Sequence, residues 1–251
     1  MHEWGIISSP PLKPRQGKKR RVRDFWASFL QKMPTIPDSY TLYIGNKNYS
    51  SWSVRPWLLL RQAGIPFTEH VIPLFLPGSA EKIAALSPSG KVPLLQHRDL
   101  QIWDSLAICE YLAERHPHLW PQDPQARAVA RAVSAEMHSG FQALRNDFTM
   151  NIRRRTPRQP SPEVQADIAR IAALWTDCRA RFGQNGPFLF GEFSIADAMF
   201  GPVCFRFQTY GVNLDGAAGV YVRHMLAQPA FQELARDAAA EPFAIAKYEV
   251  A

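Results

Sequence analysis

The feature that most constrains the fold is a change in hydrophobic periodicity at the proline-rich segment 120–124. Before this segment, short β-branched and aromatic runs alternate with helical patterns in the order strand, helix, strand, helix, strand, strand, helix. After it, apolar residues recur only at helical spacing, over residues 126–150 and 162–182 and in a helix that begins after Ser194. This pattern predicts a small mixed sheet covered by helices, followed by an all-helical domain.

The same pattern divides the chain into three parts. We expect a basic extension over residues 1–38, an α/β domain over 39–120 and an all-helical domain over 121–251. The predicted strands cover residues 40–45, 67–72, 92–96 and 100–103, with a helix before Gly64, a short helix over 80–86 and another after Ser105.

The extension accounts for most of the charge of the protein. Its eight lysines and arginines face three acids, so it contributes +5 of the net charge of +7. Its composition favours a segment without fixed structure. Contact with nucleic acid, contact with an anionic membrane and a transit peptide are alternatives, and translation from Met33 would remove the extension. With only +2 left on the body, nucleic acid is not an expected partner.

Cysteines, histidines and hydropathy set the broad class of the protein. Cys109, Cys178 and Cys204 are far apart and form neither a disulfide framework nor a C-x-x-C site, which favours a reducing compartment. The histidines have no metal-binding spacing, so no metal is expected. No stretch reaches the roughly 18 consecutive apolar residues of a membrane span, so no membrane partner is expected. We therefore expect a soluble, cytoplasmic protein.

The junction between the first strand and the first helix carries the residues most suited to chemistry. Ser50 and Ser53 occupy the two positions of a C-x-x-C motif, so dithiol exchange is impossible there. A hydroxyl and free N–H groups at a helix start can instead stabilise a thiolate that a ligand brings in. Because Pro56 lacks an N–H, we expect the helix to begin near Ser53 and to leave Ser50 and Ser51 in the preceding turn. The alternative is that these serines are plain helix caps.

Two later segments offer groups for a peptide-like ligand. In Lys91-Val92-Pro93 the proline is a candidate for a cis bond, which would turn the Val92 backbone toward a ligand; the alternative is an ordinary edge-strand proline. Asp104 and Ser105 precede a helix and suit an amino-acid head group, the acid binding an ammonium and the serine a carboxylate. The alternative is again a plain cap.

From about residue 40 onward, the chain resembles the glutathione transferase family, in particular its serine-type zeta-like and theta-like classes. The resemblance implies the glutathione transferase fold, in which a thioredoxin-like α/β domain precedes an all-α domain. It also implies a homodimer and glutathione as co-substrate. Ser194 and Asp197 match the folding motif of the family and are expected to be structural. The motifs that carry the resemblance are Ser50-Ser51-Trp52-Ser53-Val54-Arg55, Lys91-Val92-Pro93, Asp104-Ser105-Leu106-Ala107-Ile108 and Ser194-Ile195-Ala196-Asp197.

The resemblance also assigns roles at the glutathione site. It implies that Lys91 approaches the glycyl carboxylate, that Val92 pairs its backbone with the cysteinyl part, and that Pro93 is the cis proline. Asp104 and Ser105 are expected to hold the γ-glutamyl group.

The thiol-activating serine has two assignments under this resemblance. Ser50 matches the serine that activates the glutathione thiol, and Ser51 is the competing assignment because the preceding loop is one residue longer than in zeta enzymes. Trp52 stands where the zeta pattern has cysteine, and Pro56 where it has a small aliphatic residue. These departures argue against maleylacetoacetate isomerase activity.

The second substrate is expected between the domains, against the first helix of the helical part. Met137, Phe141 and Arg145 are predicted to line its pocket, although Met and Phe at this spacing also suit a core. The basic run 153–155 could attract an anionic co-substrate or be a solvated loop. We expect a glutathione transferase that directs the thiolate at an electrophilic or peroxidic small molecule. The alternatives are a glutathione-dependent isomerase of the maleylacetoacetate type and a non-catalytic binding or regulatory protein.

Overall fold

The computed structural model describes residues 39–249, and the extension predicted over residues 1–38 lies outside them. Four strands form one mixed sheet in the order β2-β1-β3-β4. Strand β1 pairs in parallel with β2 and antiparallel with β3, and β3 pairs antiparallel with β4. The sequence placed all four strands correctly to within two residues. The strands are β1 (Tyr40–Ile44), β2 (Phe67–Val71), β3 (Leu94–His97) and β4 (Leu100–Trp103).

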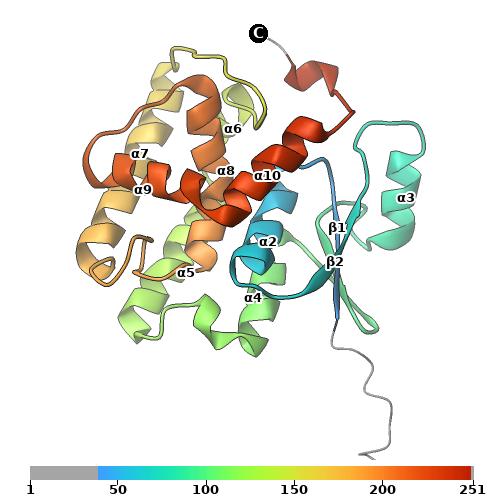
Figure 1. Ribbon diagram of the computed structural model, residues 1–251, viewed down its shortest axis with the longest axis horizontal. Coiled ribbons are helices and arrows are strands. Elements are labelled where there is room, and N and C mark those ends of the chain that lie inside the picture. Colours follow the sequence, from blue (N-terminus) through green and yellow to red (C-terminus); the bar gives the residue numbers. More distant parts are fainter. Residues whose placement is uncertain (1–38, 250–251) are drawn as a thin grey trace, which may run out of the picture. The chain divides into compact units, whose positions relative to one another are not determined.

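Three helices cover this sheet. Helices α2 (Ser51–Gln62) and α4 (Ser105–Arg115) lie on one side of it, and α3 (Ser79–Leu86) lies on the other (Figure 1). Strand β1 alternates buried and half-buried residues, as expected when one face of a strand meets a core. The chain enters α2 from the carboxyl end of β1 and α4 from the carboxyl end of β4. The predicted site residues Ser50, Ser51, Asp104 and Ser105 lie at these two helix starts.

Helix α2 begins at Ser51, two residues before the predicted start. The N–H of Val54 already donates to the Ser50 carbonyl at 3.1 Å. Pro56 lies inside the helix, and its missing N–H affects only the acceptor one turn earlier, the Trp52 carbonyl. The prediction was wrong because one lost hydrogen bond near a helix start is tolerated when the helix is packed on both sides.

The helix predicted over residues 126–150 is interrupted. Helix α5 (Pro124–Ser139) ends at Gly140, and α6 (Gln142–Asp147) follows after Phe141, whose φ is +60°. A Cβ on Gly140 would lie 2.8 Å from the Glu136 carbonyl oxygen, so glycine permits this tight exit. The remaining helices are α7 (Pro162–Phe182), α8 (Ile195–Tyr210), α9 (Gly216–Ala227) and α10 (Pro229–Ala240), with 3₁₀ turns at Pro117–Leu119 and Ala246–Tyr248.

Helix α8 lies at the centre of the core and touches α2, α5 and α9. Most of its residues are buried, in accord with its apolar sequence on all sides. The buried core runs continuously from the sheet through α2 into the helical half. The boundary predicted at residue 121 therefore stays a prediction, while the mixed-sheet and all-helical parts themselves are confirmed.

Candidate functional site

All five residues predicted to bind a peptide-like ligand line one cavity of about 450 Å³, here called the binding cavity. The Val92–Pro93 peptide bond is cis, as predicted. Within residues 39–249, the Val92 N–H and C=O make no hydrogen bond. Buried or half-buried backbone groups are normally paired, so this pair is available to a ligand. The binding cavity is lined by Trp52, Ser89, Lys91, Val92, Pro93, Trp103, Asp104, Ser105 and His138.

Asp104 and Ser105 begin α4 and have distinct contacts. Asp104 has a positive φ of 72°, and its Oδ1 accepts hydrogen bonds from the N–H groups of Leu106 at 2.8 Å and Ala107 at 3.2 Å. The cap alternative is thus confirmed for one carboxylate oxygen. The backbone N–H of Ser105, as the first of the helix, makes no hydrogen bond in the described chain. This free donor at a helix start suits a carboxylate.

His138 completes this side of the site and was missed by the sequence reasoning. Its Nε2 lies 3.2 Å from the second Asp104 oxygen, Oδ2. Its Nδ1 is buried and has no hydrogen-bond partner within the described residues. Burial lowers the pKa of His138, and the Asp104 carboxylate opposes that shift. No motif could have indicated this contact, because His138 lies at the end of α5, in the other half of the chain.

The two predicted catalytic serines line a second, smaller cavity of about 210 Å³, here called the serine cavity. Trp52 lines both cavities, so the two adjoin at its side chain. The Ser50 hydroxyl donates to Ser53 Oγ at 2.9 Å, and Ser51 Oγ accepts from Arg206 Nη2 at 3.2 Å. The serine cavity is lined by Tyr49, Ser50, Ser51, Trp52, Leu74, Phe75, Arg145, Thr149, Met150, Arg206 and Tyr248.

Only one of the three residues predicted for the second-substrate pocket lines the serine cavity. Arg145 lies on its wall. Met137 is 1% exposed and Phe141 is 8% exposed, and both belong to the core rather than to this cavity. The physical reason is that Met137 sits on the buried face of α5, and Phe141 occupies the turn that ends it. Arg206, from α8, lines the serine cavity, although the sequence did not predict it there.

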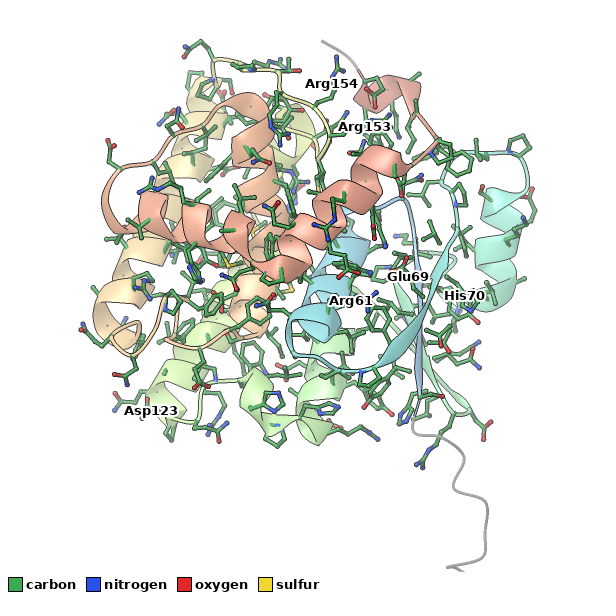
Figure 2. The ribbon with its side chains drawn as sticks, viewed as in Figure 1. Arg61, Glu69, His70, Asp123, Arg153 and Arg154 are labelled. Atoms are coloured by element: carbon green, nitrogen blue, oxygen red, sulfur yellow. The ribbon has the colours of Figure 1, made fainter. Side chains whose placement is uncertain are left out.

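The basic run 153–155 is largely paired. Arg153 Nη2 lies 2.8 Å from Glu249 Oε1, and Arg154 Nη1 lies 3.6 Å from Glu249 Oε2. Figure 2 shows both arginines close to the C-terminal turn at residues 246–248. Arg155 donates to the Gln208 side-chain oxygen at 2.7 Å. These contacts account for the charge of Arg153 and Arg154 without an anionic co-substrate.

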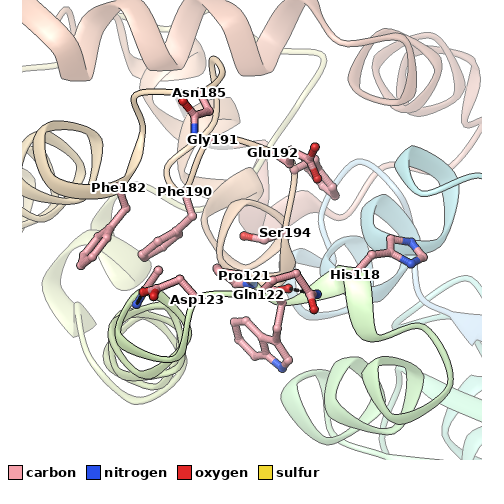
Figure 3. A pocket seen from close by; sticks show the side chains of 13 residues that line it. His118, Pro121, Gln122, Asp123, Phe182, Asn185, Phe190, Gly191, Glu192 and Ser194 are labelled. Carbon is pink, nitrogen blue, oxygen red and sulfur yellow. Dashed lines mark hydrogen bonds between the residues drawn. The ribbon is translucent and has the colours of Figure 1, made fainter.

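A third cavity of about 410 Å³ lies between residues 118–126 and residues 182–194 (Figure 3). Its walls include Asp123, His118 and Glu192, together with the stacked rings of Phe182 and Phe190, whose centroids are 5.6 Å apart. It contains none of the residues predicted to bind or react. The chemistry predicted from the sequence therefore gathers at the two cavities that share Trp52.

Comparisons with known proteins agree with this geometry. The family described as "Glutathione S-transferase, N-terminal domain" matches residues 49–115, and "Glutathione S-transferase, C-terminal domain" matches residues 161–235. The chain belongs to the glutathione S-transferase family. This family member is similar in structure to a theta class glutathione S-transferase from Xanthomonas axonopodis pv. citri with glutathione bound. The TM-score is 0.58 at 26% identity, over 77% of this chain and 95% of the other.

Two curated relatives of this glutathione S-transferase family member match different shares of its chain. A maleylacetoacetate isomerase from Rattus norvegicus is 40% identical over 110 residues, which is 42% of this chain and 50% of the isomerase. A stringent starvation protein A homolog from Haemophilus ducreyi is 25% identical over 186 residues, which is 73% of this chain and 81% of that protein. The stronger identity is thus confined to about half of the isomerase.

Three further properties bear on the class of the protein. Over residues 39–249, no helix is long and apolar enough to cross a membrane. The same part of the chain holds no group of three or more metal-ligating side chains. Cys109, Cys178 and Cys204 are unpaired and buried, and burial raises the pKa of each thiol. Buried thiols of raised pKa make poor nucleophiles, so a reactive sulfur has to come from a ligand.

Proposed function

We propose that this protein binds glutathione and directs its thiolate at an electrophilic or peroxidic small molecule. The observation that carries the proposal is the unpaired Val92 backbone beside the free N–H of Ser105 in one cavity. An extended peptide pairs with the first, and a γ-glutamyl carboxylate suits the second. Asp104 supplies an acid for the ligand ammonium, and Lys91 supplies an exposed ammonium for the glycyl carboxylate.

In this proposal, Ser50 stabilises the thiolate. Its hydroxyl now donates to Ser53, which also accepts from the Gly45 N–H at 3.1 Å. A rotation of both hydroxyls lets Ser53 donate to Ser50 and Ser50 donate to a thiolate at the start of α2. A free thiol has a pKa near 8.5, and a shift of about 2 units corresponds to about 2.7 kcal/mol. A helix dipole supplies about 0.3 to 2 kcal/mol and a charge-assisted hydrogen bond about 1.5 to 3, which is sufficient.

The reaction with an aryl chloride illustrates the transfer step. The thiol proton passes to solvent when glutathione binds and ionises. A lone pair of the thiolate sulfur then forms the C–S bond, and chloride leaves with the electron pair of the C–Cl bond. No cysteine of this chain takes part, and Ser50 keeps its proton throughout.

Two serine substitutions test this mechanism. We expect Ser50→Ala to raise the pKa of bound glutathione by 1 to 2 units, as followed by ultraviolet thiolate absorbance, and to lower turnover of 1-chloro-2,4-dinitrobenzene at least about tenfold. Ser51→Ala should leave that pKa nearly unchanged, and the exposed Ser139→Ala on α5 is the control. Unchanged turnover in both Ser50→Ala and Ser51→Ala, with glutathione still bound in calorimetry, would refute the serine mechanism.

Two other functions are separated by the same assays. The longer match to the stringent starvation protein A homolog favours a binding or regulatory protein as the second candidate. Glutathione binding without turnover of electrophiles or hydroperoxides would support it. The identity with the isomerase favours a glutathione-dependent isomerisation, although Trp52 and Pro56 depart from the zeta pattern. Isomerisation of maleylacetone would support that activity.

Two further proposals concern the oligomeric state, which is typical of the family, and the cellular location. The first is a homodimer, and analytical ultracentrifugation of the full chain tests it. The second is a cytoplasmic location, and fractionation of cells that express the native gene tests it.

A further inference from the structure

Three arginine side chains surround the start of α2 without a carboxylate partner in residues 39–249. Arg55 is 1% exposed and Arg206 is 4% exposed, while Arg145 is half-buried. Buried cations in proteins are normally paired with an anion, because leaving water costs several kcal/mol per charge. Here their acceptors are neutral, namely the carbonyls of Met137, His138, Gly140, Phe148 and Met199 and the hydroxyls of Ser51 and Ser105.

The charges of this cluster oppose one another. Burial, followed by the charge of Arg145, lowers the pKa of Arg206 to about 9, so Arg206 is still a cation at pH 7. Burial, followed by Arg145 and Arg206, lowers the pKa of Arg55. An anion among these groups would offset both the energetic cost of burying the guanidinium charges and their mutual repulsion.

Stacking fixes two of the guanidinium groups around Trp52. The guanidinium carbon of Arg55 lies 4.4 Å from the ring centroid of Trp52, and that of Arg145 lies 4.7 Å from it. Contacts of this kind are worth about 0.5 to 2 kcal/mol each. The arginines are therefore held in place before any ligand arrives, which lowers the entropy cost of binding.

The serine cavity gives an anion access to two of the arginines. Arg145 and Arg206 both line it, beside Ser51. The Nη1 atoms of both arginines donate no hydrogen bond within residues 39–249, so these donors are available to an occupant. In the proposed function, the glutathione carboxylates bind elsewhere, at Lys91 and Ser105 in the binding cavity. The volume of about 210 Å³ is below the roughly 300 Å³ of drug-sized sites, so the occupant is small.

We propose that the serine cavity binds the second substrate by a carboxylate, which Arg145 and Arg206 hold while its electrophilic carbon faces Ser50. A guanidinium fork matches a planar carboxylate better than it matches a neutral group. That the bound carboxylate is a second substrate rests on the proposed function. The carboxylate site itself requires no glutathione. That independence allows the two ideas to be tested apart.

The binding test uses an unreactive pair of probes and no glutathione. Calorimetry of the full chain compares 3-nitrobenzoate with the uncharged 3-nitrobenzamide. We expect the acid to bind at least about tenfold more tightly than the amide, and Arg145→Gln to remove that preference. Arg181→Gln is the control, because Arg181 is exposed and pairs with Asp177 at 2.9 Å on α7.

The kinetic test uses a reactive pair, 4-chloro-3-nitrobenzoate and 4-chloro-3-nitrobenzamide, each normalised to its uncatalysed rate with glutathione. Thiolate attack forms the C–S bond and expels chloride with the C–Cl electron pair, and the carboxylate is unchanged. We expect Arg145→Gln to raise KM for the acid at least about tenfold more than it raises KM for the amide. Arg206→Lys keeps the buried charge but loses the fork, and it should give a smaller rise in the same direction.

The outcomes are distinct. Equal affinity for 3-nitrobenzoate and 3-nitrobenzamide, or an acid preference that survives in both folded Arg145→Gln and Arg206→Lys, overturns the carboxylate site. An arginine-dependent acid preference in a protein that does not bind glutathione supports the site and refutes the proposed transferase function. Circular dichroism of each variant shows whether it is folded, and Arg145→Gln carries the test if the Arg206 variant is not.

Discussion

Replacing Asp197 by alanine should destabilise the protein strongly, because its buried carboxylate accepts four hydrogen bonds at the start of α8. Oδ1 accepts from the Leu189 N–H at 3.1 Å and the Tyr221 hydroxyl at 3.0 Å. Oδ2 accepts from the N–H and the hydroxyl of Ser194, each at 2.9 Å. The hydroxyls of Ser194 and Tyr221 can rotate toward other acceptors, but the two backbone N–H groups are fixed. At about 1 to 3 kcal/mol for each of these two buried unpaired donors, we expect a loss of about 2 to 6 kcal/mol.

The pH dependence of this loss has a definite sign. Burial raises the pKa of Asp197 from 3.8 to about 6 against the opposing effect of its hydrogen bonds. A group with a raised folded pKa contributes stability that is present below pH 3.8 and is lost as the pH rises through about 6. Alanine has no such titration. The difference in free energy of unfolding between the native protein and Asp197→Ala should therefore be larger at pH 5 than at pH 7.

Urea denaturation followed by circular dichroism measures these differences. Asp197→Asn keeps the shape of the side chain and two of the four acceptor contacts. Its free energy of unfolding should therefore lie between those of the native protein and Asp197→Ala. Asp177→Ala is the control, since Asp177 is exposed in a surface ion pair worth at most about 1 kcal/mol. A free energy of unfolding for Asp197→Ala within about 1 kcal/mol of the native value at pH 7, with an unchanged denaturant slope, would contradict this expectation.

The remaining predictions concern His138 and the buried cysteines. In NMR titration, His138 should have a pKa below 6.5, and Asp104→Asn should lower it further because the carboxylate opposes the effect of burial; a rise would contradict the contact. Since the folded pKa is the lower one, the stability from neutral His138 is present above pH 6.5 and is lost on acidification. The buried cysteines should resist iodoacetamide in the native protein and react on unfolding, and rapid native labelling of any of them would contradict their burial.

Secondary structure was predictable where one face of an element meets the core. The strands at residues 40–44 and 67–71 show β-branched and aromatic runs, and the structure pairs them in parallel as a strand-helix-strand unit. The break at Gly140 was not predictable, because apolar residues keep helical spacing through α6. Periodicity reports which residues face inward, and both sides of this turn face the same core.

The sequence by itself determined the local groups of the site, since each depends on neighbours in the chain. The hydroxyls at the start of α2, the cis proline after Val92 and the acid and serine that begin α4 all lie next to the turn that positions them. Only the tertiary structure decided that these groups lie around two cavities that share Trp52. It alone brought Arg206 and His138 to them, because the pattern of a single helix does not specify which other element it packs against.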